Sequence, residues 1–501
     1  MKRRAKIISV ETGKLIAVLT EEDMKELGIH VSDRVKISAG DIVTTAITDS
    51  TTTFVSEGEI ALFEDLKQAL NVNEGDEVDI KVTKHPQSVK FIRKKLDGLK
   101  LDEHEIREII QDIVDNNLSD IELSAYITAS YINGFDMDET TNLTKSMVET
   151  GQQIDFGSGV LDKHCIGGVA GNRTTMLLVP IVAAAGMTIP KTSSRAITSP
   201  AGTADTMEVL AGVDFTTEEL KKIVKDTNAC IVWGGAVNLA PADDRIIKVE
   251  YPLSIDPEGQ VLASVMAKKK SVGSDYVVID IPVGDGAKID NMHEANTLAH
   301  KFIQLGKRLD MSVECLITDG NSPIGHGIGP ALEAKDVLLA LENRGPTDLI
   351  NKSLDLTGVL FELAHEASKG EGRKMAESIL QSGKALEKMR EIIEAQGGNP
   401  DIKPDEISVG EHTHVINSSI RGTVRHINNR ALSKVARAAG APKDLGAGVY
   451  LHVGVGDEVE KGQPLFTIYA QNKNKIVEAI KFNEEYVPLR VGGVILERII
   501  E

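Results

Sequence analysis

The 501-residue chain is predicted to be a multidomain α/β protein. We expect a small N-terminal β-rich, barrel-like domain, then a helical domain and an α/β domain, and finally a C-terminal α+β domain. Two observations predict this class. The spacing of apolar residues changes along the chain from strand-like to helical, then to alternating strands and helices, and then to short strands again. A chain of this length is also expected to divide into several domains.

Residues 1–85 are predicted to form the barrel-like domain, which ends at His85-Pro86. Short β-forming runs are separated by turn residues, and Glu21–Leu27 and Leu62–Leu70 have helical spacing. The predicted strands are Ala5–Val10, Leu15–Leu19, Arg34–Ile37, Asp41–Thr48 and Glu77–Val82.

Residues 86–155 are predicted to form the helical domain. Apolar residues between Phe91 and Val114 recur every three or four positions. Ser119–Glu122 and Asp136–Glu139 are typical of helix starts. A further helical segment at about 243–272 is expected to return to this domain.

Residues 156–242 and 273–404 are predicted to form the α/β domain. An apolar helix at Thr174–Ala185 follows a glycine-rich loop, and later strand-like runs alternate with helical patterns. These runs are Cys230–Trp233, Tyr276–Ile281 and Ser312–Thr318.

Residues 405–501 are predicted to form the α+β domain, with short strands around one helix at Arg430–Ala439. The expected strands are Val415–Ile420, Val424–Ile427, Gly448–Val453 and Pro464–Ile468. Residues 455–470 resemble the hairpin of a biotinyl/lipoyl-type fold, but the sequence has no lysine at an MKM-like turn. We therefore expect a structural domain.

The net charge of −19 and the pI near 5.2 argue against a non-specific nucleic-acid binder. The longest apolar run, Met176–Met187, is too short to span a bilayer and is interrupted by Pro180. Three cysteines without CxxC spacing indicate reduced thiols. We expect a cytoplasmic protein with neither nucleic-acid nor membrane partners.

The segment from Lys163 to Ala204 contains no Asp or Glu, although the chain has 75 acidic residues. By proportion, about six would be expected there. Glycines and helix N-termini in the same segment could bring backbone N–H groups close to an anion. The segment therefore predicts a phosphate pocket inside an acidic protein, and we expect this pocket to be walled off from neighbouring carboxylates.

Two motifs in this segment each have a purely structural alternative. Lys163 to Arg173 includes Gly167-Gly168 before a helix, which suits a phosphate but also a tight β-to-α turn. Ser193 to Glu208 offers hydroxyl groups and the fork of Arg195, but Asp205 and Glu208 also stand at capping-box spacing. Both readings of the second motif can hold.

Six ordered segments resemble the thymidine/pyrimidine nucleoside phosphorylases, over about residues 90 to 500. KHCIGGVAGN from Lys163 is similar to their K-H-S-T-G-G-V-G-D loop. SSRAITSPAGTADTMEVL from Ser193 is similar to their S-G-R-G-x-x-x-T-G-G-T-x-D-x-x-E signature. The other segments are NLAPAD (238–243), ASVMAKKKSVGSD (263–275), VVIDIPVGDGAK (277–288) and TDGNSPIGHGIGPALE (318–333).

The extra N-terminal domain and three departures make the chain most similar to the archaeal-type AMP phosphorylases. The family's Y-A-L-R arginine, which reads the pyrimidine, is missing from YPLSID at 251–256, and Asp256 brings a carboxyl group instead. Lys288 stands where V-G-x-G-A-F has an aromatic residue, and a cation near the sugar suits a nucleotide. Cys165-Ile166 replaces the Ser-Thr pair that otherwise binds phosphate.

The resemblance makes Asp256 the proton donor to the leaving base and places Lys163 and His164 beside the inorganic phosphate. The residues implied to contact AMP are Gly168, Ser194, Arg195, Ala196, Ile197, Thr198, Ser199, Thr203, Ser264 and Lys288. No cofactor is implied, and no metal-ligand spacing is found. His412 and His414 are interpreted as a simple strand pair rather than as a metal site. At least two of Lys268–Lys270 are expected on a solvated helix face.

The implied activity is phosphorolysis of AMP, and also of CMP and UMP, to the free base and ribose 1,5-bisphosphate in nucleotide catabolism. The implied fold is shared with pyrimidine nucleoside phosphorylases and anthranilate phosphoribosyltransferase. The implied assembly is a homodimer or larger homo-oligomer, with residues 1–85 serving oligomerisation. A thymidine or pyrimidine nucleoside phosphorylase and a non-catalytic assembly protein remain the alternatives.

Overall fold

The computed structural model describes residues 1–83, 86–196, 199–253 and 255–492. The chain forms two compact units, Met1–Gly151 with Ala240–Ser264, and Gln152–Leu239 with Val265–Glu501. The predicted fold class, a multidomain α/β protein with a β-rich barrel at its N-terminus, is confirmed. Among the described residues, no helix is long and apolar enough to cross a membrane.

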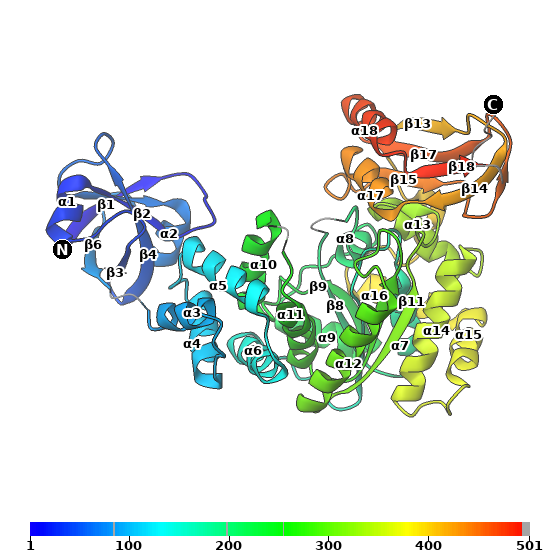
Figure 1. Cartoon of the computed structure of the whole chain (residues 1–501), viewed down its shortest axis with the longest axis horizontal. Helices are drawn as coiled ribbons and strands as arrows, with labels where there is room; N and C mark the ends of the chain where they lie inside the picture. The colour runs from blue at the N-terminus through cyan, green and yellow to red at the C-terminus, as the bar shows by residue number, and fades with distance from the viewer. Residues whose placement is uncertain (84–85, 197–198, 254, 493–501) are drawn as a thin grey trace, which may run out of the picture. The chain divides into compact units, whose positions relative to one another are not determined.

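The first unit begins with a closed six-stranded barrel, drawn in blue in Figure 1. Its strand order is β1-β5-β2-β4-β3-β6, and β6 returns to pair with β1. Buried apolar side chains such as Leu19, Ile37 and Ile60 fill the interior. The elements are β1 (Lys2–Ile8), β2 (Ile16–Thr20), α1 (Glu21–Leu27), β3 (Arg34–Ala39), β4 (Ile42–Thr51), β5 (Glu59–Phe63), α2 (Glu64–Leu70) and β6 (Glu77–Val82).

The prediction for the barrel missed one strand. The sequence assigned Leu62–Leu70 to a helix, whereas β5 occupies Glu59–Phe63 and the helix begins at Glu64. Strand β5 pairs in parallel with β1 and antiparallel with β2. Pairing with strands that are distant in the sequence therefore makes Glu59–Phe63 a strand.

Helices complete the first unit, and the expected start signals are observed. Ser119 and Asp136 each form a capping box with the glutamate three residues later. Helix α10 (Pro241–Leu253) packs against α4 and α5. The other helices are α3 (Ser88–Leu96), α4 (Glu103–Val114), α5 (Asp120–Asn133) and α6 (Met137–Thr150), while α11 (Glu258–Ser271) begins in this unit and ends in the second.

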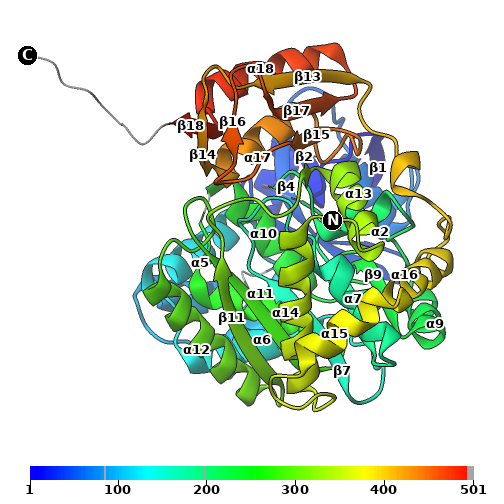
Figure 2. The same cartoon turned by 90° about the vertical axis from the view of Figure 1, so that its right-hand side faces the viewer.

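The centre of the second unit is a parallel sheet in the order β11-β10-β7. Helices α12 (Met292–Arg308) and α14 (Thr347–Leu363) pack against β10 and β11 (Figure 2). The apolar helix α7 (Thr174–Ala184) is buried almost throughout. The strands are β7 (Val160–Cys165), β10 (Ser274–Val283) and β11 (Ser312–Asp319), and a parallel pair is formed by β8 (Ile189–Ser193) and β9 (Ala229–Trp233).

Further helices surround this sheet and build the main hydrophobic core with α7. Helix α13 contacts α8, whereas α14 and α16 contact α7. These helices are α8 (Thr203–Glu208), α9 (Thr217–Thr227), α13 (Pro330–Leu341), α15 (Gly372–Gln381) and α16 (Lys384–Ala395).

The C-terminal part adds two antiparallel sheets, ordered β12-β15-β17-β13 and β16-β14-β18. Strand β12 (Gly327–Ile328) pairs with β15 and so ties the α/β part to this layer. The sequence predicted one helix, but α17 (Asn429–Ala438) and α18 (Lys473–Tyr486) are both present. The strands are β13 (His412–Asn417), β14 (Gly422–Ile427), β15 (Gly448–Leu451), β16 (Glu458–Val459), β17 (Pro464–Ala470) and β18 (Leu489–Gly492).

Candidate active site

The glycine-rich loop after β7 lies directly against two other loops of the second unit. Gly168 has a φ of 95°, and a Cβ built on it would lie 2.3 Å from the backbone nitrogen of Lys288. A Cβ on Gly171 would lie 2.1 Å from the carbonyl oxygen of Ile324. The backbone therefore requires glycine at both positions, and it brings Gly168 and Lys288, two predicted AMP contacts, side by side.

Lys163 points into the protein from the end of β7 and is 1% exposed. Its Nζ donates to Thr174 Oγ1 at 2.8 Å and lies 3.7 Å from Asp280 Oδ2. Burial lowers the pKa of Lys163, and the negative charge of Asp280 opposes that effect. The ammonium group thus binds protein atoms at the base of the glycine loop.

Asp280 on β10 is the partner of Lys163 that the sequence motifs did not reveal. Its Oδ2 lies 3.1 Å from Lys352 Nζ and accepts from Asn172 Nδ2 at 3.3 Å, while Oδ1 accepts from Thr318 Oγ1 at 2.6 Å. Burial alone would raise the pKa of Asp280, but the charges of Lys163 and Lys352 together with hydrogen bonds, among them that of Thr318, lower it below its usual value. One buried carboxylate therefore connects two strands, the glycine loop and α14.

A second buried carboxylate, Asp162, binds two further lysines beside His164. Lys191 Nζ lies 3.2 Å and Lys269 Nζ 2.8 Å from its oxygens. Burial lowers the pKa of Lys191 to about 7. Burial, followed by the positive charges of Lys269 and Lys191, holds the pKa of His164 well below its usual range. His164 is therefore a neutral imidazole at neutral pH. Lys269 is buried rather than solvated.

The guanidinium group of Arg195 binds other groups of the protein. It donates to both carboxylate oxygens of Glu208, at 2.6 and 2.8 Å, and lies 5.0 Å from the ring centre of Trp233. Hydrogen bonding to Glu208 raises the pKa of Arg195. Asp205 instead accepts from the backbone N–H groups of Ala196 and Gly202, at 2.7 and 2.8 Å. The capping alternative thus holds for Asp205 but not for Glu208.

Arg173 links the two predicted motifs. It donates to Thr203 Oγ1 at 3.0 Å and to the carbonyl of Ala201 at 2.7 Å, and it forms an ion pair with Glu333. Ser194 and Ser199 are exposed on the same segment. The predicted contacts Ile197 and Thr198 lie outside the described residues.

In the folded chain, carboxylates from other segments lie next to the acid-free segment 163–204. Asp280, Asp162, Glu333 and Glu208 each come from outside that segment and contact one of its lysines or arginines. A buried cation without a partner is costly, so the fold supplies one for each. The expectation of a segment walled off from carboxylates was therefore wrong. The glycine loop and the exposed side chain of Lys288 lie side by side next to this segment.

The two remaining predicted residues belong to the first unit. Asp256 is exposed on the segment between α10 and α11. Ser264 on α11 donates its hydroxyl to Asp243 Oδ2 at 2.7 Å, and Asp243 is 0% exposed. The structure therefore places the predicted proton donor in one unit and the predicted phosphate contacts in the other.

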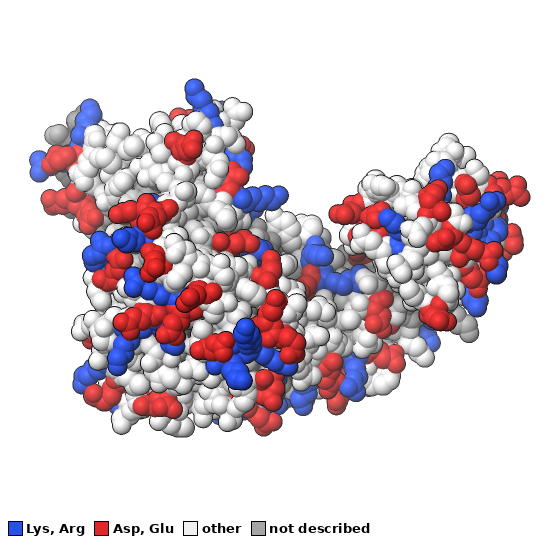
Figure 3. Space-filling model, turned by 180° about the vertical axis from the view of Figure 1, so that it is seen from behind, with Lys and Arg blue, Asp and Glu red and all other residues white. Residues whose placement is uncertain are grey.

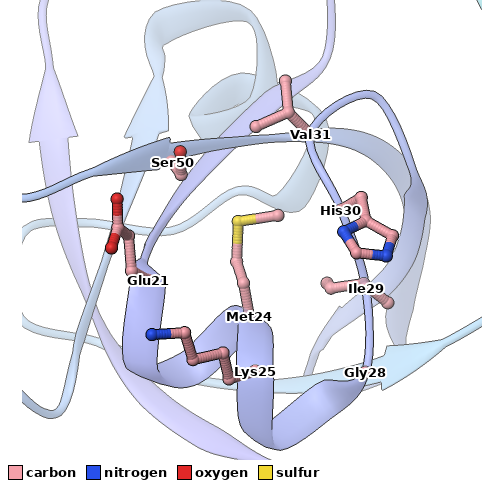
Figure 4. Close-up of a pocket in the computed structure, with 8 residues that line it drawn as sticks. All are labelled: Glu21, Met24, Lys25, Gly28, Ile29, His30, Val31 and Ser50. Carbon is pink, nitrogen blue, oxygen red and sulfur yellow. The ribbon is translucent and has the colours of Figure 1, made fainter.

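Two pockets among the described residues are lined by none of the predicted site residues. One of about 460 Å³ lies beside α1 of the barrel domain, where Met24 points between Glu21 and the Ile29–Val31 segment (Figure 4). The other, of about 360 Å³, is lined by Thr318 and Lys352 beside Asp280. Across the described residues, no group of three or more His, Cys, Asp or Glu is placed to hold a metal ion.

Family models match three parts of the chain. The helical bundle domain of a glycosyl transferase family matches residues 89–151, and its a/b domain matches residues 157–386. A pyrimidine nucleoside phosphorylase C-terminal domain matches residues 423–489.

Several curated proteins are similar to the whole chain. An AMP phosphorylase of Thermococcus kodakarensis is 50% identical over 100% of this chain and 99% of its own length. AMP phosphorylase 1 of Archaeoglobus fulgidus is 48% identical over 98% and 97%, and the AMP phosphorylase of Methanocaldococcus jannaschii is 48% identical over 99% of both. The anthranilate phosphoribosyltransferase structure from Thermus thermophilus has a TM-score of 0.52 at 19% identity, covering 61% of this chain and 98% of that one. That likeness shows a shared fold.

Proposed function

The chain belongs to the AMP phosphorylase family, and we propose that it cleaves AMP with inorganic phosphate, releasing adenine and ribose 1,5-bisphosphate. One observation in particular supports a nucleotide as substrate. The glycine loop lies against the loop of Lys288, so backbone N–H groups and a cation are adjacent on the surface of one unit. CMP and UMP are proposed as further substrates.

The chemistry proposed for the site follows from what phosphorolysis requires. Phosphate must be held in line with C1′ of the ribose, because positioning supplies much of the reduction in barrier. We assign the 5′-phosphate to Lys288 and the inorganic phosphate to the neighbourhood of Lys163 and His164. The base leaves as an anion unless it is protonated, and Asp256 is proposed to donate that proton to adenine N7. The proposal needs no cofactor.

The test is a panel of nucleosides and nucleoside monophosphates, incubated with and without inorganic phosphate. We expect release of adenine from AMP only when phosphate is present, with ribose 1,5-bisphosphate as the sugar product. Release of thymine or uracil from nucleosides, with none from AMP, would instead identify a pyrimidine nucleoside phosphorylase. No release from any compound would favour a non-catalytic assembly protein.

A further inference from the structure

Helix α17 of the C-terminal part begins with a buried asparagine that holds two loops of the α/β part. Asn429 is 0% exposed. Its Oδ1 accepts from the backbone N–H of Ala170, in the glycine loop, at 3.1 Å. Its Nδ2 donates to the carbonyl of Gly320, after β11, at 2.9 Å. An amide can donate and accept at once, so this one side chain satisfies both loops.

Helix α17 also contacts the loop that carries Lys288 and the segment that carries Ser199. Arg430 donates to the carbonyl of Ala287 at 3.0 Å, directly before Lys288. Arg437 donates to the carbonyl of Ser199 at 3.2 Å. Every one of these contacts ends on a backbone atom of a loop rather than on a proposed substrate-binding side chain. The helix therefore holds these loops in position.

The loops held by α17 also touch one another. There is no room for a Cβ between Gly168 and the backbone of Ala287 and Lys288. A Cβ on Gly286 would in turn lie 3.3 Å from Asn429 Cβ. The glycine loop, the Lys288 loop and the start of α17 thus form a closed ring of contacts, in which a shift of one member must displace the others.

We propose that α17 is a positioning helix for the substrate site, in which Asn429 and Arg430 fix the glycine loop relative to Lys288. This inference rests on the proposed function, because it is the spacing of those two loops that must fit the nucleotide. It gives the C-terminal part, expected from the sequence to be purely structural, a role in substrate binding. Neither residue is proposed to touch the substrate.

The experiment compares Asn429→Ala and Arg430→Met with a matched control, Asn472→Ala. Asn472 caps α18, since its side chain accepts from the Lys475 backbone N–H at 3.0 Å, and so its loss weakens the start of another helix while the contacts of Asn429 and Arg430 stay in place. We expect the KM for AMP to rise about tenfold in both positioning variants, the size of one lost hydrogen bond, with kcat changing much less. The control should keep both constants within about twofold of wild type.

Amide hydrogen exchange of the substrate-free protein provides a readout that does not depend on activity. The Ala170 amide should exchange faster in Asn429→Ala than in the control, with melting temperatures that show both variants folded. An unchanged KM together with unchanged exchange would overturn the inference, as would equal changes in the control. A wild-type protein that releases no adenine from AMP would refute the proposed function instead, and the exchange data alone would then decide the positioning role.

Discussion

Lys288 brings an exposed cation to the loop that lies against Gly168. If it binds the 5′-phosphate, Lys288→Ala should lower kcat/KM for AMP roughly 10- to 100-fold, because a hydrogen bond to a charged group contributes about 1.5–3 kcal/mol. Turnover of adenosine should hardly change, so the preference for AMP should disappear. Steady-state kinetics on both substrates measure this, with Lys307→Ala on α12 as the control. Retained discrimination would mean that another group reads the phosphate.

Asp256 is the residue assigned to the leaving base, and it lies exposed between α10 and α11. Asn has nearly the same shape but cannot give up a proton to the base. Asp256→Asn should therefore reduce kcat by about 10²- to 10⁴-fold, the usual contribution of a general acid, while the Kd for AMP changes little. Rapid-quench turnover and calorimetric binding separate the two effects. Normal turnover in this variant would exclude the role, and Glu258→Gln on the next helix serves as the control.

Sequence reasoning found the cations of the candidate site but not their partners. Lys163 and Asp280 both lie in segments that resemble the family, but nothing in the sequence pairs them, and Asp280 appears only as an acid within the apolar run 276–283. An acid in a buried strand is itself a signal, because a carboxylate is rarely buried without a partner. Lys352 on α14 gave no such signal, since only tertiary folding brings it within 3.1 Å of Asp280.

Among the elements, those with strong local signals were predicted best. Helix α7 was expected at Thr174–Ala185 and is observed at Thr174–Ala184, because its apolar run has a clear length and start. Helix α18 was missed, and it buries only Ile476 and Ala479, so its apolar period is weak. The positions of loops, such as Gly168 against Lys288, depend on contacts distant in sequence and were not predictable from local pattern.

The middle of α13 contains a buried carboxylate that should make the stability of the protein depend on pH. Asp336 is 2% exposed, and its Oδ2 accepts from the backbone N–H groups of His326 and Gly327, both at 2.7 Å. Burial raises its pKa to about 6. Its unfolded pKa is about 3.9, so the folded state binds more protons between roughly pH 4 and 6. The contribution of this group to stability is therefore lost as the pH rises through that window.

Asp336→Asn keeps an oxygen that can accept from the N–H groups of His326 and Gly327, but its side chain no longer binds or releases a proton. The stability of the variant relative to wild type should thus increase from about pH 4 to 6, by on the order of 2 kcal/mol, and then level off. Thermal unfolding of both proteins across this pH range tests the slope, with the exposed Glu366→Gln as the control. A constant difference between variant and wild type would contradict the assigned titration.

On the scale of the whole molecule, the substrate is an anion and the protein carries a net charge of −19. Figure 3 shows acidic and basic side chains interspersed over the visible face. Attraction of AMP must therefore be local, because the charge of the protein as a whole repels an anion. This favours short-range positioning of backbone N–H groups and Lys288 over long-range steering.

Assembly is the remaining property that belongs to the whole molecule, and we propose that the barrel contributes to it. A closed barrel leaves no free strand edge, so contact with a second copy must use side chains. Ile42 and Val43, at the start of β4, are 41% and 59% exposed, which is unusual for large apolar residues next to one another. They are the residues at which we expect a second copy to bind.

Replacing Ile42 and Val43 with threonine keeps the β-branched shape that suits a strand but removes apolar contact area. The variant Ile42→Thr/Val43→Thr should have a smaller mass than wild type in light scattering, while AMP phosphorolysis persists, because the barrel supplies none of the proposed site residues. Val415→Thr, also an exposed strand position, should keep the wild-type mass. If the mass is unchanged even in a chain that begins at residue 86, the copies associate through other surfaces and the barrel has no part in assembly.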